Sequence, residues 1–258
     1  MKTYIFSDIN DTIKPENGKI SNFTADVLKS LHQKNIELVL VTGKNRQKTE
    51  EFAEAYGGSR YIITTNGGEV FDTQTRQVIY TSNIPKDAIE KLYQLSKKHN
   101  LRFILNVDAD FRFTTRIKYF DGSEKQLNSI DEVAENYKVV GGVLTEIPDD
   151  LIAEIKLAIC EISGVTIGNE GRNKGNNFID FISEYANKGI AIKKLLRFLD
   201  VDYKNTISIG NERNDISMFS ATNKSVAVDN ASDEIKKMVD LLIDSVENDG
   251  VGKYLKNL

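Results

Sequence analysis

The residues of greatest chemical interest are Asp8, Asn10 and Asp11, which end an apolar, β-branched run at the start of the chain. A buried parallel strand is apolar on both faces, so polar side chains where such a strand stops lie at the carboxyl edge of a sheet. Open α/β folds place their chemistry at this edge. A carboxylate there can hold a metal ion or attack a phosphorus atom. Which of these Asp8 does depends on the groups that other segments bring to it.

Three further segments carry polar groups to the same predicted edge. They are Val41–Lys44, the helix start at Lys188-Gly189, and Gly210–Asp215. Thr42 offers a hydroxyl and nearby backbone N–H groups, and Lys188 offers a point charge for the oxygens of a transferring phosphoryl group. Asp8 and Asp215 could share Mg²⁺, which prefers hard oxygen ligands and keeps several waters. Together these groups predict a phosphate site with a metal ion.

The elements that position these groups alternate between strand and helix at both ends of the chain. The apolar patterns predict the opening strand, a helix over 24–33, a strand over 36–42, a helix over 45–56, a strand over 61–64, a hairpin of 69–72 with 77–80, a helix over 188–198, a strand over 205–210, a short helix over 215–219, a strand over 224–228 and a helix over 233–239. This alternation implies right-handed crossovers and a parallel sheet. We therefore expect the two stretches to form halves of one Rossmann-like core.

The middle of the chain contains a weak internal repeat. The segment from Asn83 to Leu92 parallels the segment from Glu146 to Ile155, and each begins with Ile-Pro-x-Asp. The alternative is that Ile-Pro-x-Asp is only a common helix start. If the repeat is real, two helix–strand–strand units share one small sheet, with strands over 101–107, 111–117, 164–168 and 177–182. We therefore predict a core domain of residues 1–82 and 183–258 and an inserted α+β cap domain of residues 83–182.

Composition and charge exclude several classes of protein. The net charge of −4 gives no case for nucleic-acid binding. No apolar run approaches the length of a membrane span, and the N-terminus lacks the pattern of a signal peptide, so a cytoplasmic location is expected. The single cysteine suits a reducing compartment. Because Cys160 lies in an apolar run, we expect it to be a small core residue.

The four polar segments resemble the motifs of the haloacid dehalogenase superfamily, and within it the Cof-type sugar phosphatases with an inserted α/β cap. The first motif, usually D-x-D-x-T, reads Asp-Ile-Asn-Asp-Thr over 8–12. The second is Thr42, followed by Gly43-Lys44 where Gly-Arg is usual, and the third is Lys188. The fourth, G-D-x-x-N-D, reads Gly-Asn-Glu-Arg-Asn-Asp over 210–215. Four motifs in order, with a cap-length insertion between the second and third, make the resemblance specific.

The resemblance implies a role for each matching residue. Asp8 would be the nucleophile; the phosphate ligands would be Thr42, Gly43 and Lys188; and the Mg²⁺ ligands would be Asp8, the backbone carbonyl of Asn10, Asn211 and Asp215. It also implies a phosphatase that acts on a small phosphorylated metabolite, such as a sugar phosphate, through an aspartyl-phosphate intermediate. We expect a monomer or homodimer that binds neither nucleic acid nor membrane.

Two positions depart from the family pattern. Asn10 stands where the family has its acid/base Asp, and an amide cannot transfer a proton near neutral pH. Asn211 stands where the family has a charged metal ligand, so Mg²⁺ should bind more weakly. Asp11 and Glu212 each lie one position after a missing aspartate. Successive strand side chains point in opposite directions, so neither is expected to take the place of that aspartate. Asn10 is compatible with an engineered trap, a slow enzyme or a catalytically dead relative.

The departures keep a second class of function open, a catalytically impaired or non-catalytic protein that binds a phosphorylated ligand or regulates through it. Other residues have both a functional and a structural interpretation. Asn66, in Asn-Gly-Gly, is a turn residue or a sugar contact, and Lys44 and Arg46 are solvated charges or phosphate-side cations. Arg172 in the cap and Asn214 in the fourth motif are further candidates for contact with substrate.

Overall fold

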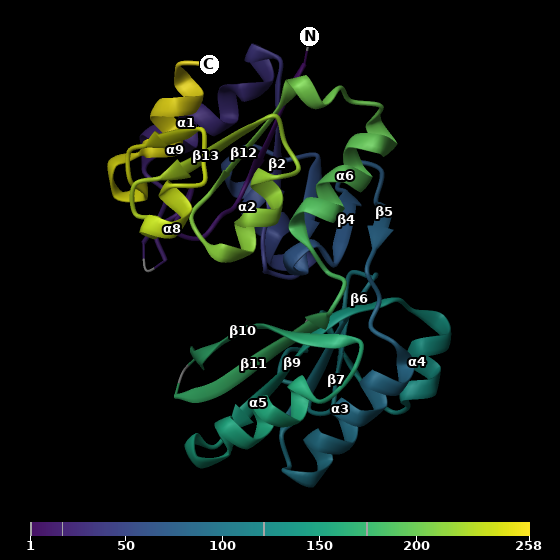
Figure 1. The fold of residues 1–258 in the computed structure, drawn as a ribbon. Coiled ribbons are helices and arrows are strands. Elements are labelled where there is room, and N and C mark those ends of the chain that lie inside the picture. Colours follow the sequence, from purple (N-terminus) through teal and green to yellow (C-terminus); the bar gives the residue numbers. More distant parts are fainter. Residues whose placement is uncertain (1, 17, 121, 174) are drawn as a thin grey trace. The chain divides into compact units, whose positions relative to one another are not determined.

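The computed structural model describes residues 2–16, 18–120, 122–173 and 175–258. These residues form two compact units. The core unit consists of the chain up to Tyr80 and from Asn187 onward, and the inserted unit consists of Thr81–Ala186. Figure 1 shows the chain leaving the first unit after β5 and returning to it before α6. The core unit is therefore built from both ends of the chain, and the middle of the chain forms a unit of its own.

The core unit contains an eight-stranded sheet with the order β14-β13-β12-β1-β2-β3-β4-β5. Its strands are β1 (Thr3–Ser7), β2 (Ile36–Val41), β3 (Tyr61–Thr64), β4 (Glu69–Asp72), β5 (Gln77–Thr81), β12 (Thr206–Gly210), β13 (Lys224–Val228) and β14 (Leu241–Ile243). Pairing is parallel from β14 to β3, and β4 is antiparallel to β3. Strand β1 thus pairs with β2 on one side and with β12 on the other, so it joins the two ends of the sequence.

Helices cover both faces of this sheet. They are α1 (Asn22–Ser30), α2 (Arg46–Tyr56), α6 (Lys188–Leu199), α7 (Ile216–Phe219), α8 (Asp233–Lys236) and α9 (Gly250–Lys256). Side chains of α1, α2 and α9 pack with Ile5 and Leu40 in one apolar cluster, whereas side chains of α6, α7 and α8 pack with Phe6 and Val39 in another. Neighbouring strand residues belong to opposite clusters because side chains alternate along a strand. This is the predicted parallel α/β core.

The inserted unit contains a six-stranded sheet with the order β10-β11-β9-β6-β7-β8. Its strands are β6 (Arg102–Val107), β7 (Arg112–Thr114), β8 (Glu124–Gln126), β9 (Val139–Ile147), β10 (Val165–Asn173) and β11 (Asn176–Ser183), and its helices are α3 (Lys86–Lys98), α4 (Ile130–Asn136) and α5 (Ile152–Cys160). A single apolar cluster joins α3, α4 and α5 to this sheet. Short 3₁₀ turns complete the chain at Leu31–Lys34, Thr65–Gly67, Asp149–Leu151, Tyr203–Asn205, Arg213–Asp215 and Val246–Asn248.

The two predicted helix–strand–strand units are present as α3–β6–β7 and α5–β10–β11. Strand β9, which was not predicted, lies between them and pairs with both β6 and β11. Gly142 lies within this strand. A Cβ atom at Gly142 would lie 2.2 Å from the ring of Phe181 and 2.3 Å from the carbonyl oxygen of Ile104. The glycine is therefore needed for close approach of neighbouring strands.

Several local predictions were wrong. Cys160 is exposed at the end of α5 instead of lying in the core, because Ile155 and Ile159 form the buried stripe of that helix. The predicted strand over 111–117 shortens to β7, and the predicted helix over 233–239 ends at Lys236. Helix α4, strands β8 and β14, and helix α9 were not predicted.

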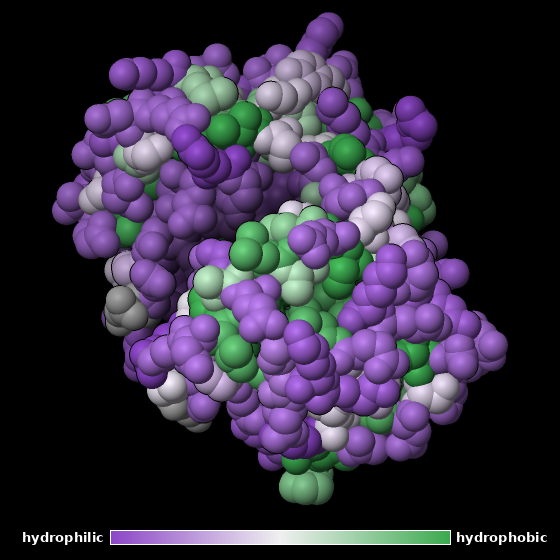
Figure 2. Space-filling view, turned by 60° about the horizontal axis from the view of Figure 1, so that its bottom comes forward, coloured by the Kyte–Doolittle hydropathy of each residue, from purple (hydrophilic) through white to green (hydrophobic). Residues whose placement is uncertain are grey.

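The hydropathy of the surface agrees with the amino-acid composition. The face shown in Figure 2 is mostly hydrophilic, with hydrophobic side chains gathered in smaller areas. Within the described ranges, the helices are all too short or too polar to cross a membrane.

Candidate active site

The carboxyl edge of the core sheet brings the first, second and fourth motifs to neighbouring positions. Asp8 follows β1, Thr42 follows β2 and Asn211 follows β12. The N–H of Asp8 donates to the carbonyl oxygen of Ile209 on β12 at 3.0 Å, and the N–H of Thr42 donates to that of Ile63 at 2.9 Å. Parallel strands end at the same edge, so the three segments share one end of the sheet.

Lys188 connects two carboxylates at this edge. Its Nζ donates to Asp8 Oδ1 at 2.8 Å and to Asp215 Oδ1 at 2.7 Å. The side chain of Lys188 is 1% exposed, and that of Asp215 is fully buried. Charge-assisted hydrogen bonds of this length are strong in a site from which water is excluded. The result is a rigid Asp8–Lys188–Asp215 bridge between residues far apart in the sequence.

Local sequence explains why Lys188 occupies this position. The Asn187 side chain caps α6 by accepting the N–H of Ile190 at 3.0 Å, which makes Lys188 the first residue of the helix. A Cβ atom at Gly189 would lie 2.1 Å from the carbonyl oxygen of Ser217, so only glycine permits this approach of α6 to α7. The cap and the glycine together set the direction from which the lysine enters the site.

Burial and neighbouring charges shift the pKa values of the bridge residues. Burial raises the pKa of Asp8 to about 7; the positive charge of Lys188 opposes this shift, and the charge of Asp215 adds to it. Burial alone would lower the pKa of Lys188, but the two carboxylates outweigh it and hold that pKa above its usual value. Burial, and then the charge of Asp215, also raises the pKa of Glu212. One lysine thus bonds to two carboxylates, and the negative charge that remains suits a hard cation.

The loop of the fourth motif is held by Asp215. Its Oδ2 accepts the N–H groups of Asn211 at 2.8 Å and Glu212 at 3.0 Å. The hydroxyl of Thr12 donates to Asn211 Oδ1 at 2.8 Å, which ties the first motif to the fourth. Among the residues that the structure describes, no group of three or more His, Cys, Asp or Glu side chains could hold a metal ion. Amide and backbone oxygens would have to complete a metal site here.

Asn10 and Asp11 lie in the turn after Asp8 and have different surroundings. Asn10 is exposed, and its backbone forms an isolated bridge with Lys14. Asp11 adopts a left-handed backbone with φ of 52°, and its Oδ1 accepts the N–H of Glu16 at 2.6 Å. The Asp11 carboxylate is therefore engaged within its own turn, which supports the expectation that it does not replace the missing acid at position 10.

Thr42 and Asn66 meet on the β2–β3 side of the edge. Asn66 donates its N–H to the carbonyl oxygen of Thr42 at 3.0 Å, and Asn214 Nδ2 donates to Asn66 Oδ1 at 3.1 Å. A Cβ atom at Gly43 would lie 3.2 Å from the Asn66 amide. Thr42 Oγ1 accepts the N–H of Lys44 at 3.2 Å. The structure therefore brings five predicted site residues from three segments together.

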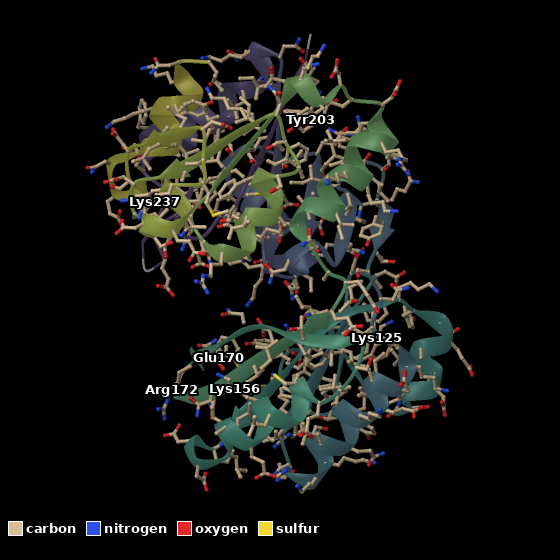
Figure 3. All side chains as sticks on the ribbon, viewed as in Figure 1. Lys125, Lys156, Glu170, Arg172, Tyr203 and Lys237 are labelled. Atoms are coloured by element: carbon tan, nitrogen blue, oxygen red, sulfur yellow. The ribbon has the colours of Figure 1, made fainter. Side chains whose placement is uncertain are left out.

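Two further candidates have polar partners within their own units. Arg46 is neither a solvated charge nor a phosphate-side cation: it is 8% exposed, its Nε donates to Glu69 Oε2 at 2.9 Å, and its guanidinium packs 4.1 Å from the ring centre of Phe71. Burial required a partner, and the sequence pattern did not indicate Glu69. Arg172 is exposed on β10 of the inserted unit, where Nε donates to the carbonyl oxygen of Gly175 at 3.2 Å (Figure 3).

Sequence reasoning assigned no role to Lys14 or to Thr12, the last residue of the first motif. Lys14 lies two positions after the first motif and is half-buried in the turn, and Thr12 anchors the loop of the fourth motif. The sequence signal for Lys14 was a charged residue between the apolar residues Ile13 and Pro15, just after the motif. Its importance depends on neighbours from another strand, which the local sequence does not reveal.

The chain is similar to known hydrolases over almost its whole length. Residues 5–255 match the family model of haloacid dehalogenase-like hydrolases. A 5-amino-6-(5-phospho-D-ribitylamino)uracil phosphatase of Bacillus subtilis is 24% identical over 254 residues, which are 97% of this chain and 93% of that protein.

Solved structures show the same fold. A haloacid dehalogenase-like hydrolase from Bacteroides thetaiotaomicron superposes with a TM-score of 0.80 at 19% identity, covering 100% of this chain and 99% of that one. A structure described as a subclass IIB sugar phosphatase of the superfamily superposes with a TM-score of 0.68 at 21% identity, covering 99% and 98% of the two chains. At such identities the likeness concerns the fold.

Proposed function

This chain belongs to the haloacid dehalogenase-like hydrolases, and on that premise we propose that it is a Mg²⁺-dependent phosphatase of a small phosphorylated metabolite, such as a sugar phosphate. The observation that carries the proposal is the buried bridge of Asp8, Lys188 and Asp215 at the carboxyl edge of the sheet. Relatives named as phosphatases, including the one from Bacillus subtilis, support the reaction class.

In the proposed reaction, a carboxylate oxygen of Asp8 attacks the phosphorus atom of the substrate. A bond forms between that oxygen and phosphorus while the bond from phosphorus to the leaving oxygen breaks. The leaving oxygen takes a proton from water, because Asn10 has none to give. Water then attacks the phosphorus atom of the aspartyl-phosphate, and the bond from phosphorus to the Asp8 oxygen breaks. The attacking water loses one proton, which neutralises the hydroxide left by the first step, and inorganic phosphate and the Asp8 carboxylate are released.

Lys188, Thr42 and Gly43 would position the phosphoryl group. Lys188 holds Asp8 Oδ1, which fixes the orientation of the nucleophile, and its charge would stabilise the negative oxygens of the transition state. The Thr42 hydroxyl and the backbone N–H of Gly43 follow the neighbouring strand β2. These groups are in place before substrate binds, so little reorganisation is needed during the reaction.

The residues present fit Mg²⁺, since two buried carboxylates and neutral oxygens form a donor set that this ion accepts. Asp8, the backbone carbonyl of Asn10, Asn211 and Asp215 would hold it. A bound Mg²⁺ would neutralise charge on the phosphoryl oxygens and screen the carboxylate from the phosphate. Because Asn211 is uncharged, we expect affinity below that of a site with aspartate at this position.

The alternative of a non-catalytic ligand-binding protein is less well supported. It rests on Asn10 and Asn211, whereas the nucleophile, the lysine and the carboxylate that holds it are all present. General acid–base catalysis contributes roughly 10²–10⁴ to the rate, so loss of the acid predicts a slow enzyme and not an inert one.

The test is release of inorganic phosphate from a broad panel of phosphomonoesters with MgCl₂ or EDTA. We expect slow turnover that EDTA abolishes. The Asp8→Asn protein is the control for contaminating phosphatase. Failure of both the natural protein and the Asn10→Asp variant to exceed this control would refute the proposal.

A further inference from the structure

Three lysines lie in the segments that follow strands β1 and β2. Lys14 lies in the turn after Asp8, Lys44 follows Thr42, and Lys48 lies in the first turn of α2. We call Lys14, Lys44 and Lys48 the lysine cluster. Burial lowers the pKa of Lys44, the charges of Lys14 and Lys48 lower it further, and the charge of Asp8 opposes them. Strands β1 and β2 pair in parallel up to Ser7 and Leu40, so the segments that carry Lys14 and Lys44 leave neighbouring strand ends.

The backbone holds two of these lysines in place. The N–H of Lys44 donates to Thr42 Oγ1 at 3.2 Å, and its carbonyl oxygen accepts the N–H of Thr65 at 2.9 Å. The N–H of Lys14 donates to the carbonyl oxygen of Ile9 at 2.9 Å, and its own carbonyl accepts the N–H of Asp11 at 2.7 Å. Both therefore extend from ordered turns that flank the site.

The ammonium groups of the cluster lack acidic partners in the described residues. Lys14 Nζ donates to the carbonyl oxygens of Pro15 at 3.2 Å and Glu16 at 3.3 Å, and no ion pair or side-chain hydrogen bond of Lys44 or Lys48 is seen in the ranges that the structure describes. Lys188, by contrast, has two carboxylates. A half-buried cation beside like charges is unfavourable unless an anion binds to it.

The transferring phosphoryl group does not account for the whole cluster. Lys188, Thr42 and Gly43 already provide its proposed contacts, and the exposed Lys48 lies on α2, beyond the strand end. A second anion bound among the three lysines would relieve their mutual repulsion. We infer that the lysine cluster binds a second anionic group of the substrate, a phosphate or a carboxylate, so that the preferred substrates carry one anionic group besides the phosphate that is hydrolysed.

This inference rests on the proposed function and sharpens its substrate class. The experiment compares glucose 6-phosphate with two relatives that carry a second anion, 6-phosphogluconate and glucose 1,6-bisphosphate. The natural protein should show a higher kcat/KM for at least one of these relatives. Lys44→Met and Lys14→Met should each lower kcat/KM for that relative about tenfold more than for glucose 6-phosphate, the effect of losing a charged hydrogen bond.

Lys29→Met is the matched control, because Lys29 is exposed on α1 and has no proposed role. It should leave the ratio of kcat/KM values unchanged. An equal loss on all substrates in Lys44→Met would assign this lysine to the transferring phosphate and overturn the inference. No loss in either cluster variant would make the cluster a solvated surface and also overturn it.

Binding to the Asp8→Asn protein separates this inference from the proposed function. Calorimetry with the same three compounds needs no turnover. Tighter binding of a doubly anionic compound that Lys44→Met weakens would support the cluster even if no substrate were hydrolysed. Hydrolysis without such a preference, in kinetics and in binding, would leave the proposed function standing and refute the inference.

Discussion

The two sides of the core sheet edge differ in how their charges are satisfied. On the β1–β12 side, Lys188 bridges Asp8 and Asp215, and Asp215 also holds the backbone of the following loop. On the β2–β3 side, Lys44 is half-buried among like charges, and the polar contacts of Asn66 are with neutral groups. On the first side the charged groups are paired within the protein, whereas on the second side Lys44 has no acidic partner in the described residues.

This difference separates chemistry from recognition. A group that reacts must be oriented before the substrate arrives, and the hydrogen bonds of the β1–β12 side provide that orientation. The energetic cost is visible in Asp8, whose burial raises its pKa to about 7. A group that recognises a substrate gains from partners that only the substrate supplies. We therefore expect substitutions on the first side to change the rate for every substrate, and substitutions on the second to change the choice among them.

The largest expected effect is that of Asp8→Asn, which should abolish phosphate release on all substrates because an amide cannot form the acyl phosphate. Asp11→Asn is the matched control, since Asp11 binds the N–H of Glu16 within its own turn. It should retain most of the activity. Steady-state phosphate release measures both, and activity in the Asp8→Asn protein above that of a protein-free blank would remove Asp8 from the mechanism.

Asn10→Asp should raise turnover by roughly 10²–10⁴, the contribution of a positioned acid–base group. Asn10 is exposed, so a carboxyl group can be introduced there without burying a charge. Ground-state binding of phosphate should change little, because the acid acts mainly in the transition state. Initial rates and phosphate inhibition constants are the measurements. An unchanged kcat would mean that position 10 is not where the leaving group departs.

Asn211→Asp should tighten Mg²⁺ binding about tenfold, because it adds a charged oxygen ligand. The Thr12 hydroxyl, which now donates to Asn211 Oδ1, can donate equally to a carboxylate, so the loop should keep its structure. Calorimetric titration with MgCl₂ measures the affinity. Asn214→Asp adds the same charge at an exposed neighbouring position and serves as the control. Equal tightening in both variants would indicate a general field effect and not a metal ligand at 211.

The smallest expected effect concerns stability and pH. The pKa of Asp8 is raised from 3.8 to about 7, so the folded protein binds this proton more tightly than the unfolded chain. Stability must then fall as pH rises between about 4 and 7 through this group, and Asp8→Asn lacks that loss. The melting temperature of the variant, relative to that of the natural protein without metal, should increase by on the order of 5 °C from pH 5 to pH 8. A pH-independent difference would contradict the shift.

Local sequence was sufficient for the parts of the molecule whose structure depends on near neighbours. Apolar runs located β2 and β3, and Asn187 and Gly189 set the start of α6. The order and spacing of four polar segments predicted which strand ends carry the candidate site. These features follow from side-chain periodicity, capping and the rule that parallel strands share a carboxyl edge.

Only the tertiary structure decided the features that depend on distant partners. Gly142 lies in a central strand, where Phe181 occupies the space that a side chain would need. Arg46 is buried because Glu69 neutralises it, and Cys160 is exposed because two isoleucines of the same helix face the core. Lys14 and Lys44 are thirty positions apart in the sequence, and only the pairing of β1 with β2 brings their charges together. Hydrophobic periodicity predicts the face of its own helix or strand on which a side chain lies. The partner that the side chain contacts is set by long-range packing.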